Sequence, residues 1–184
     1  AHGHHPPHPR SSTEVDVNAE RWQQLATAFA GEVGDTTPCG LCDVCATVLD
    51  VAGAGITLMD GDQVGPLCVT GRGATELEMM QFTLGEGPCH DAFRAGRPVF
   101  VPRLDDAAPD RWLAFAQLGE SLGIGAVFAF PLTLDDARLG VLTVYQRAPG
   151  PLTATQLELC DGLAAVLAAS IAKMSRAARF GELS

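Results

Sequence analysis

The chain has 184 residues, of which 47% are hydrophobic and 18% are charged. This length and composition suit one globular domain with enough apolar surface to form a core. Acidic residues outnumber basic ones by 22 to 12, so the formal net charge is −10. Nucleic-acid binding depends on clustered Lys and Arg side chains, and this balance argues against it. No apolar run approaches the roughly 20 residues of a membrane span, so we expect a cytoplasmic protein without a membrane segment.

The first 19 residues are rich in His and Pro and lack the apolar segment of a secretory signal. We expect residues 1–19 to be a flexible leader, 20–178 to form a single domain, and 179–184 to be a short tail. Four of the five histidines lie in that leader. His90 is therefore the one histidine expected in the folded part.

Two helices are predicted at the start of the domain. The spacing of apolar residues indicates an amphipathic helix over Glu20–Val33. Thr37 and Pro38 are typical of a helix cap and a first helical residue, so a second helix should run from there to about Asp50.

A β-hairpin should follow, with strands over Ala54–Asp60 and Val64–Thr70 around a Gly61-Asp62 turn. Pro66 lies inside the second of these strands. Because proline has no N–H to donate, it favours a strand at the edge of a sheet.

Shorter elements are expected in the middle of the chain. Two short helices are predicted over Thr75–Gln81 and Pro88–Arg94, and a short strand over Pro98–Val101. A longer helix should follow over Asp110–Leu122, with Asp110 as its N-cap. A second hairpin, with apolar strands over Ala126–Leu132 and Leu139–Tyr145, is the clearest in the sequence. Thr153 then caps a closing helix that reaches Met174.

This element order predicts an α+β fold with a mainly antiparallel sheet of five to six strands and helices on both sides. The closing helix, Thr153–Met174, has two apolar faces. One can pack on the sheet and the other on a second helix. We therefore expect the N- and C-terminal helices to pack together and to form a homodimer through Glu20–Val33 and Thr153–Met174.

Catalytic signatures are absent from the sequence: it has no P-loop, nucleophile elbow, zinc-protease helix or dinucleotide-binding glycine motif. Nucleophilic catalysis by a cysteine needs a base, and His90 directly follows Cys89. Adjacent residues on a helix do not face each other. We therefore expect no enzymatic activity.

Six cysteines occur in the chain, and a cytoplasmic location favours free thiols over disulfides. Cys39, Cys42 and Cys45 are spaced like the ligands of an iron–sulfur cluster or a zinc ion, and Cys68, Cys89 or Cys160 could supply a fourth ligand. The same spacing on a helix also describes a buried stripe of small thiols that continues to Leu49. Both interpretations stay open, and the cofactor is unassigned.

Cys89 is a second candidate for chemistry. Pro88 at the first helical position would place Cys89 in the first turn of a helix, where the helix dipole favours a thiolate. Glu86 and Asp91 would oppose that effect. The alternatives are a redox-sensing thiol and a thiol that lines a pocket.

Seven segments of the sequence match the pattern of a known family. The longest contains Glu78 and Gln81, followed by the turn Leu84-Gly85-Glu86-Gly87-Pro88-Cys89. The segments are Leu77–Cys89, Asp91–Phe93, Gly96–Val99, Arg111–Trp112, Phe128–Leu132, Arg138–Leu142 and Pro149–Leu152. Together they resemble the GAF sensory domain of actinobacterial regulators, over about residues 20–175. That resemblance implies a PAS-like antiparallel sheet with a ligand pocket on one face and dimerising terminal helices.

In those regulators a GAF domain often precedes an ANTAR domain, an RNA-binding module that governs transcription antitermination. The chain carries no such module, so we expect either an excised fragment or a sensor that works through a regulatory protein partner. The resemblance implies a small-molecule or redox signal, passed through the terminal helices to an output. Alternatives are an iron–sulfur, haem or zinc-dependent redox or gas sensor and an enzyme like the free methionine sulfoxide reductases, with Cys89 and Cys68 as its thiols.

The expected pocket lies between the sheet and residues 84–93. The apolar walls would be Met59, Phe128 and Phe130, with Leu84 and Phe93 opposite. The groups that fix the ligand would be the backbone amides of Gly85 and Gly87 together with Glu86, Cys89 and Asp91. Glycines allow the backbone to approach a ligand closely.

Overall fold

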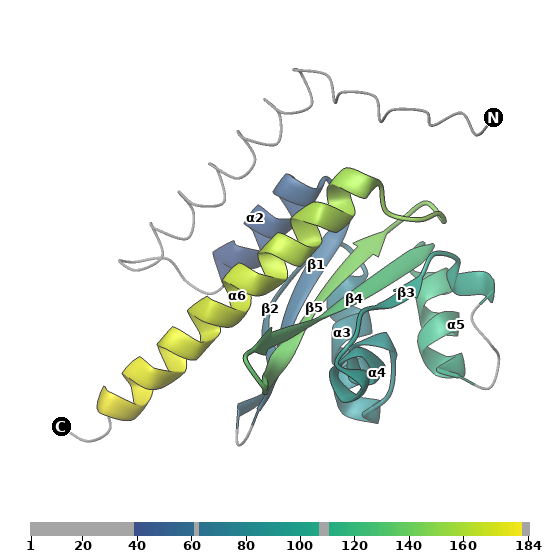
Figure 1. Cartoon of the computed structure of the whole chain (residues 1–184). Helices are drawn as coiled ribbons and strands as arrows, with labels where there is room; N and C mark the ends of the chain where they lie inside the picture. Colours follow the sequence, from purple (N-terminus) through teal and green to yellow (C-terminus); the bar gives the residue numbers. More distant parts are fainter. Residues whose placement is uncertain (1–38, 61–62, 107–110, 182–184) are drawn as a thin grey trace, which may run out of the picture. The chain divides into compact units, whose positions relative to one another are not determined.

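The computed structural model describes residues 39–60, 63–106 and 111–181. Five strands form one antiparallel sheet in the order β2-β1-β5-β4-β3 (Figure 1). The strands are β1 (Gly53–Asp60), β2 (Gln63–Thr70), β3 (Val99–Val101), β4 (Ala126–Leu134) and β5 (Ala137–Gln146). The predicted α+β class with an antiparallel sheet is confirmed. The predicted helix over Glu20–Val33, and its packing, lie outside the described residues.

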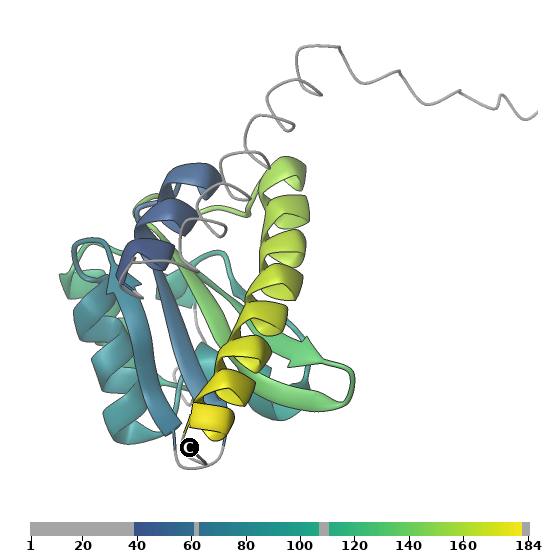
Figure 2. The same cartoon turned by 90° about the vertical axis from the view of Figure 1, so that its left-hand side faces the viewer.

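Helices cover both faces of the sheet, with α2 and α6 on one face and α3, α4 and α5 on the other (Figures 1 and 2). The α-helices are α2 (Cys39–Leu49), α3 (Ala74–Leu84), α4 (Pro88–Ala95), α5 (Leu113–Ser121) and α6 (Ala154–Gly181), and a 3-10 turn, η1, spans Leu104–Asp106. Because side chains alternate along a strand, each strand sends every second residue to the α6 face and the others to the α3 face.

The edge position predicted for the strand with Pro66 is confirmed, since β2 comes first in the order of the described strands and pairs with β1. The register between β1 and β2 shifts between Ile56 and Thr57, opposite that proline. A bulge at this point accommodates a residue that cannot donate to the ladder.

The predicted cap of the closing helix is also present. Thr153 Oγ1 accepts a hydrogen bond from the Gln156 backbone N–H at 3.1 Å, and Gln156 Oε1 accepts one from the Thr153 N–H at 2.9 Å. This reciprocal pair is a capping box. The helix predicted from Asp110 begins later, at Leu113. Trp112 precedes it with φ 56°, a left-handed conformation that cannot continue a helix backwards; Asp110 lies outside the described residues.

One stretch of α6, Ala154–Lys173, is long and apolar enough to cross a membrane by length and composition, with a mean hydropathy of 1.3. This corrects the expectation that no run in the sequence approaches that length. Its apolarity has a structural cause, because Leu159, Leu163 and Leu167 are buried where α6 packs on β4 and β5. A core helix passes the same test of length and composition, so the stretch is weak evidence for a membrane span.

Candidate functional site

Helix α3 buries two polar side chains, Glu78 and Gln81, while two of its large apolar ones, Met79 and Phe82, are exposed. Glu78 and Gln81 are each 1% exposed and follow Leu77 on the buried face, whereas Met79 and Phe82 are 47% and 41% exposed. Burying an acid and an amide is costly unless both are hydrogen-bonded. A helix that reverses the usual preference therefore points to a polar site beneath it.

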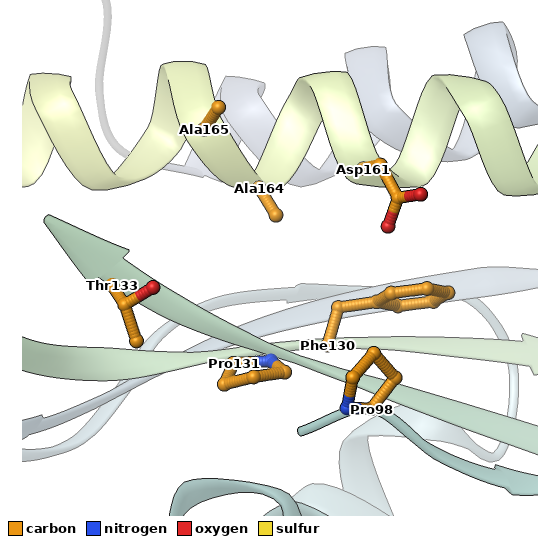
Figure 3. Close-up of a pocket in the computed structure, with 7 residues that line it drawn as sticks. All are labelled: Pro98, Phe130, Pro131, Thr133, Asp161, Ala164 and Ala165. Atoms are coloured by element: carbon orange, nitrogen blue, oxygen red, sulfur yellow. The ribbon is translucent and has the colours of Figure 1, made fainter. Parts of the chain in front are cut away.

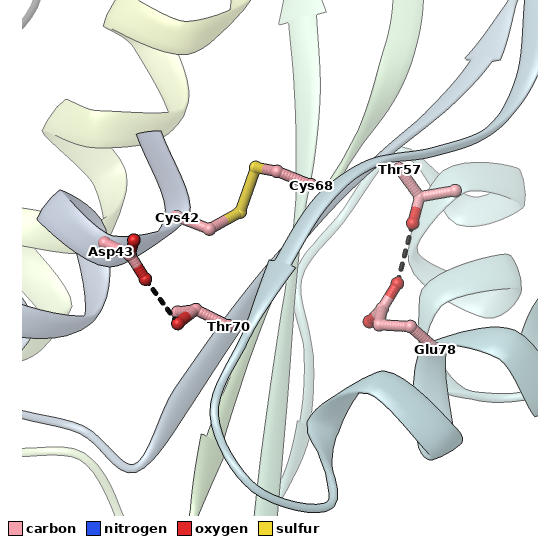
Figure 4. Close-up of a disulfide and its surroundings, with 6 residues drawn as sticks. All are labelled: Cys42, Asp43, Thr57, Cys68, Thr70 and Glu78. Atoms are coloured by element: carbon pink, nitrogen blue, oxygen red, sulfur yellow. Dashed lines mark hydrogen bonds between the residues drawn. A yellow bond between two sulfur atoms is a disulfide. The ribbon is translucent and has the colours of Figure 1, made fainter. Parts of the chain in front are cut away.

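Glu78 is the centre of that site. Thr57 Oγ1 of β1 donates to Glu78 Oε2 at 2.7 Å (Figure 4), and the Tyr145 hydroxyl of β5 donates to Glu78 Oε1. All three side chains are buried. Two neighbouring strands thus present hydroxyl groups to one carboxyl group on α3.

Gln81 links the sheet, α3 and α4. Its Nε2 donates to the Tyr145 hydroxyl at 3.3 Å, and its Oε1 accepts from the backbone N–H of Cys89 at 2.9 Å. The Gln81 backbone carbonyl lies 2.9 Å from Nε2 of His90. One side chain therefore fixes the start of α4 relative to the strand that holds Tyr145.

Two glycines make room for these polar side chains. A Cβ atom at Gly55 would lie 2.8 Å from Glu78 Cδ, and one at Gly87 would lie 2.6 Å from Gln81 Oε1. Gly87 also has φ 137°, which side-chain-bearing residues rarely adopt. Both positions need glycine because the polar groups approach the backbone so closely.

Thr143 of β5 contributes a hydroxyl group that has no hydrogen-bond partner among the described residues, although the side chain is fully buried. It lies close enough to Glu78 and to Cys89 to lower the pKa of both groups. Orphaned buried polar atoms are uncommon in folded proteins. We define the polar cluster as Thr57, Glu78, Gln81, Cys89, Thr143 and Tyr145.

Burial dominates the acid–base behaviour of the polar cluster. It raises the pKa of Glu78, and the hydrogen bonds from Thr57 and Tyr145 offset only part of that rise. It also raises the pKa of Tyr145 and of the Cys89 thiol well above their ordinary values, and the nearby Glu78 charge adds to both shifts. Perturbed ionisable groups gathered in one place are typical of functional sites.

The family model of the GAF domain matches residues 40–172 of this sequence. The chain belongs to the GAF domain family. GAF domains are sensory and regulatory domains, so the coarse expectation of a sensor holds. No curated protein matches the sequence.

Solved structures support the GAF fold. The GAF domain of an Acinetobacter phosphoenolpyruvate-protein phosphotransferase has a TM-score of 0.66 at 15% identity, over 92% of this chain and 99% of that one. A free methionine-R-sulfoxide reductase from Neisseria meningitidis, solved with its substrate, has a TM-score of 0.61 at 20% identity. The match covers 95% of this chain and 99% of that one. A domain of a putative two-component sensor histidine kinase from Sinorhizobium meliloti 1021 has a TM-score of 0.59 at 20% identity. The match covers 73% of this chain and 87% of that one. At these identities the similarity shows the fold alone.

Three of the predicted ligand-binding residues meet on the α4 face of the GAF domain. Cys89 Sγ lies 4.0 Å from Met59 Sδ, and Phe93 packs with Met59 on the small apolar cluster around Cys89. This group adjoins the polar cluster through Cys89, which belongs to both. The structure therefore brings Met59, Cys89 and Phe93 together, as the sequence analysis proposed.

Phe128 and Phe130 lie on the opposite face of the sheet. Phe130 lines a groove of about 250 Å³ with Asp161 and Ala164 of α6, and Figure 3 shows its ring directed toward that helix. Phe128 is two residues away on β4, so it shares this face, and both rings contact Phe100. The predicted pocket wall is not formed, because alternation along β4 turns Ala129, not its aromatic neighbours, toward Cys89.

The α3–α4 turn is mostly outward-facing. Leu84 is 50% exposed, Glu86 is exposed, and Gly85 ends α3 in the left-handed conformation with no atom near its missing side chain. Asp91 pairs with Arg111 at 2.7 Å instead of reaching the polar cluster. Of the residues predicted to fix a ligand, only Cys89 and Gly87 adjoin the polar cluster.

Glu78 and Gln81 belong to the family pattern but are not among the residues predicted to bind a ligand, and neither are Thr57, Thr143 and Tyr145. A signal for all five was present. Leu77, Glu78 and Gln81 lie three, four and seven residues after Ala74, and residues at those spacings share a helix face. Thr57, Thr143 and Tyr145 lie at inward-facing positions of apolar strands, where polar side chains are uncommon and therefore indicate a polar site.

The cysteines are arranged differently from the expected free thiols. Cys42 of α2 forms a disulfide with Cys68 of β2 (Figure 4), so that expectation is wrong for this pair. The reason is that α2 packs on β2 with the two Cα atoms 6.0 Å apart, which suits a disulfide. Cys42 and Cys45 are both fully buried, which confirms the predicted stripe toward Leu49.

The disulfide also bears on the metal and enzyme alternatives. A disulfide sulfur is not a thiolate ligand, so Cys42 cannot join Cys39 and Cys45 in a cluster while that bond is intact; the Cys39 side chain lies outside the described residues. No three His, Cys, Asp or Glu side chains within the described part of the chain converge as a metal site. Cys68 is bonded to α2 on one face and Cys89 lies under α4 on the other, so the two proposed catalytic thiols do not meet.

Proposed function

We propose that this GAF domain is a sensor that binds a small polar molecule at the polar cluster beneath α3 and α4. The observation that carries this proposal is the set of buried polar groups around Glu78, with the Thr143 hydroxyl left without a partner. A ligand that donates and accepts hydrogen bonds would satisfy Thr143 and share Glu78 with Thr57 and Tyr145. Its binding would then offset the cost of keeping these groups away from water.

Entry of the ligand would require α4 to move away from the sheet. The turn between α3 and α4 contains Gly85 and Gly87, both with positive φ, and glycines absorb changes in backbone angles readily. The hydrogen bond from the Cys89 N–H to Gln81 holds α4 closed. A ligand that competes for Gln81 would release it.

The signal would pass through β5 to α6. Thr143 and Tyr145 face the polar cluster, while Leu142 and Val144, their neighbours on the same strand, are buried on the face where α6 packs. A shift of β5 would therefore change the packing of α6. Ligand binding would act as a population shift between two arrangements of that helix.

The output would be a change in a homodimer or in a regulatory protein partner, reached through α6. We propose a role in transcription regulation in the cytoplasm of an actinobacterium, in the manner of GAF/ANTAR regulators, without direct contact of this domain with nucleic acid. We also propose that the domain has no catalytic turnover. A small molecule is favoured over an oxidant as the signal, because burial raises the pKa of the Cys89 thiol and a protonated thiol reacts slowly.

The test is a thermal-shift screen of small metabolites on the wild type and on Thr143→Val. This variant loses only a hydroxyl group that makes no hydrogen bond in the structure, so it should fold as well as the wild type. Compounds that raise the melting temperature of the wild type should lose most of their effect on Thr143→Val. Thr83→Val, at an exposed threonine of α3, should respond like the wild type. Equal responses of all three proteins would contradict the proposed site.

A further inference from the structure

A second groove, of about 580 Å³, runs along the outer side of α4 where it meets β3, and we call it the arginine groove. Arg94 of α4, Arg97 of the following turn and Arg111 line it together with one acidic residue, Asp91. Its volume is within the range of small-molecule sites. It faces the solvent and is separate from the polar cluster, so a ligand here goes beyond the proposed function.

The charge of the arginine groove is opposite to that of the chain. Three arginines and one aspartate line it, an excess of two positive charges, although Arg94 Nη2 also donates to the carbonyl oxygen of Gly85 at 3.4 Å. The whole chain, by contrast, carries a formal charge of −10. A concave site lined by one sign of charge attracts ions of the other sign. This local excess matches a ligand group with two negative charges.

Arg111 is held in position before any ligand arrives. Its Nη2 donates to Asp91 Oδ2 at 2.7 Å, and its guanidinium carbon lies 4.4 Å from the centre of the Trp112 ring. A guanidinium group fixed by one carboxylate and one aromatic ring still has other N–H groups for a ligand. Holding it in place lowers the entropy cost of binding.

Arg97 supplies a charge with no competing partner, since it makes no hydrogen bond or ion pair with any other residue that the structure describes. The end of α4 carries exposed carbonyl oxygens that would repel an anion. Arg138 compensates for them, because its Nη1 donates to the carbonyl oxygens of Phe93 and Arg94 at 3.2 and 2.6 Å. The positive charge of Arg97 is therefore available to a ligand.

We infer that the arginine groove binds a small organic dianion, either a phosphate monoester or a dicarboxylate. Arginine pairs with both groups through two parallel hydrogen bonds. The carbon part of the ligand would lie on Pro98 and Val99, which also line the groove. A neighbouring groove of about 320 Å³ shares Val99 and Arg111 with it, so a planar body attached to the anionic group has further surface beside it.

Calorimetric titration of the full chain tests this inference with inorganic phosphate, phenyl phosphate and succinate as probes. Each is titrated at constant ionic strength, at a pH where the phosphates carry two charges. Phenyl phosphate should bind more tightly than inorganic phosphate because its ring adds apolar contacts with Pro98 and Val99. Tighter binding of phenyl phosphate than succinate assigns the site to phosphate monoesters, and the reverse assigns it to dicarboxylates. Absence of binding by every probe overturns the inference.

Three variants separate a ligand site from a structural cluster. Arg97→Gln should weaken probe binding about tenfold, the value of one charge-assisted hydrogen bond. Arg72→Gln removes the same charge from an exposed arginine outside the groove and should leave binding unchanged. Asp91→Asn removes the competing negative charge, but its amide oxygen can still accept from Arg111 Nη2 and hold that side chain, so binding should strengthen; a purely structural role of the Asp91–Arg111 ion pair predicts a loss. Equal binding by Arg97→Gln and the wild type, or weaker binding by Asp91→Asn, overturns the inference.

Discussion

Among single residues, Glu78 couples the stability of the domain to pH most directly. Burial raises its pKa above the ordinary carboxyl value of 4.5. The folded state then keeps a proton on Glu78 at pH values where the unfolded chain has released it. The free energy of unfolding must therefore fall as pH rises from the ordinary value through the folded-state pKa, and the stabilisation is fully present only below that window.

The variant Glu78→Gln should remove this dependence. Glutamine can accept from the Tyr145 hydroxyl and donate to Thr57, so it reproduces the protonated acid without a charge to bury. We expect the variant to gain stability relative to the wild type as pH rises above about 4.5, the ordinary carboxyl value. Urea unfolding across that range measures the difference. Glu76→Gln, at an exposed carboxyl group of the same helix, should follow the wild type. Parallel curves for Glu78→Gln and the wild type would contradict the expected shift.

The sequence predicted part of the residue-scale site. Met59, Cys89 and Phe93 could be placed because strand alternation and the Pro88 helix start both point inward at those positions. Leu84 was assigned to a pocket wall because apolar residues usually face the core. Helix α3 breaks that preference by burying Glu78. Spacing shows that Glu78 shares a face with buried apolar residues, but it does not show that this face, with its acid, packs against the sheet. The burial of Glu78 is explained by its hydrogen-bond partners, Thr57 on β1 and Tyr145 on β5.

Among the secondary-structure elements, α2 and β2 are the pair joined by a covalent bond. The Cys42–Cys68 disulfide ties the helix to an edge strand, and Thr70 Oγ1 donates to Asp43 Oδ1 at 2.5 Å beside it (Figure 4). An edge strand has only one neighbour to hold it. The disulfide therefore adds a second attachment for β2, to the helix that covers this face of the sheet, beside its one neighbouring strand β1.

Reduction of this disulfide should destabilise the domain. The bond closes a loop between residues 26 apart in the sequence, and opening a loop of that size costs about 3 kcal/mol in the chain-entropy description. We expect dithiothreitol to lower the free energy of unfolding of the wild type by about that amount. Hydrogen exchange in β2 should rise most. The double variant Cys42→Ala and Cys68→Ala should not respond to dithiothreitol, and an unresponsive wild type would contradict the role of the bond.

The elements themselves could be predicted well, because both hairpins and the capped closing helix rest on local signals. Alternation and turn residues mark the strands, and Thr153 marks the start of α6 through hydrogen bonds to its own first turn. The start of α5 could not be predicted, since Trp112 takes a left-handed conformation that no local preference of tryptophan indicates. The Cys42–Cys68 pairing depends on how α2 lies on the sheet, which is a tertiary feature.

At the scale of the whole molecule, α6 leaves apolar surface that the described residues do not cover. Only 33% of the apolar stretch Ala154–Lys173 is buried. Leu163 and Leu167 are buried on the sheet, but Val166 between them is 37% exposed. Exposed apolar surface on a helix favours association with another helix. This supports the proposed dimer through α6, and it gives one residue at which the dimer can be tested without disturbing the core.

Val166→Glu should convert the proposed homodimer into monomers. A charge at an apolar helix contact loses water without gaining a partner, so the dimer dissociation constant should rise about tenfold or more. Light scattering after size-exclusion chromatography gives the mass of each form over a dilution series. Leu113→Glu places the same charge at an exposed apolar residue of α5, on the other side of the sheet, and should leave the dimer intact. A wild type that is monomeric throughout the series, or equal dissociation constants for both variants, would show that α6 is not the dimer contact. Its exposed apolar face would then be left for a partner protein.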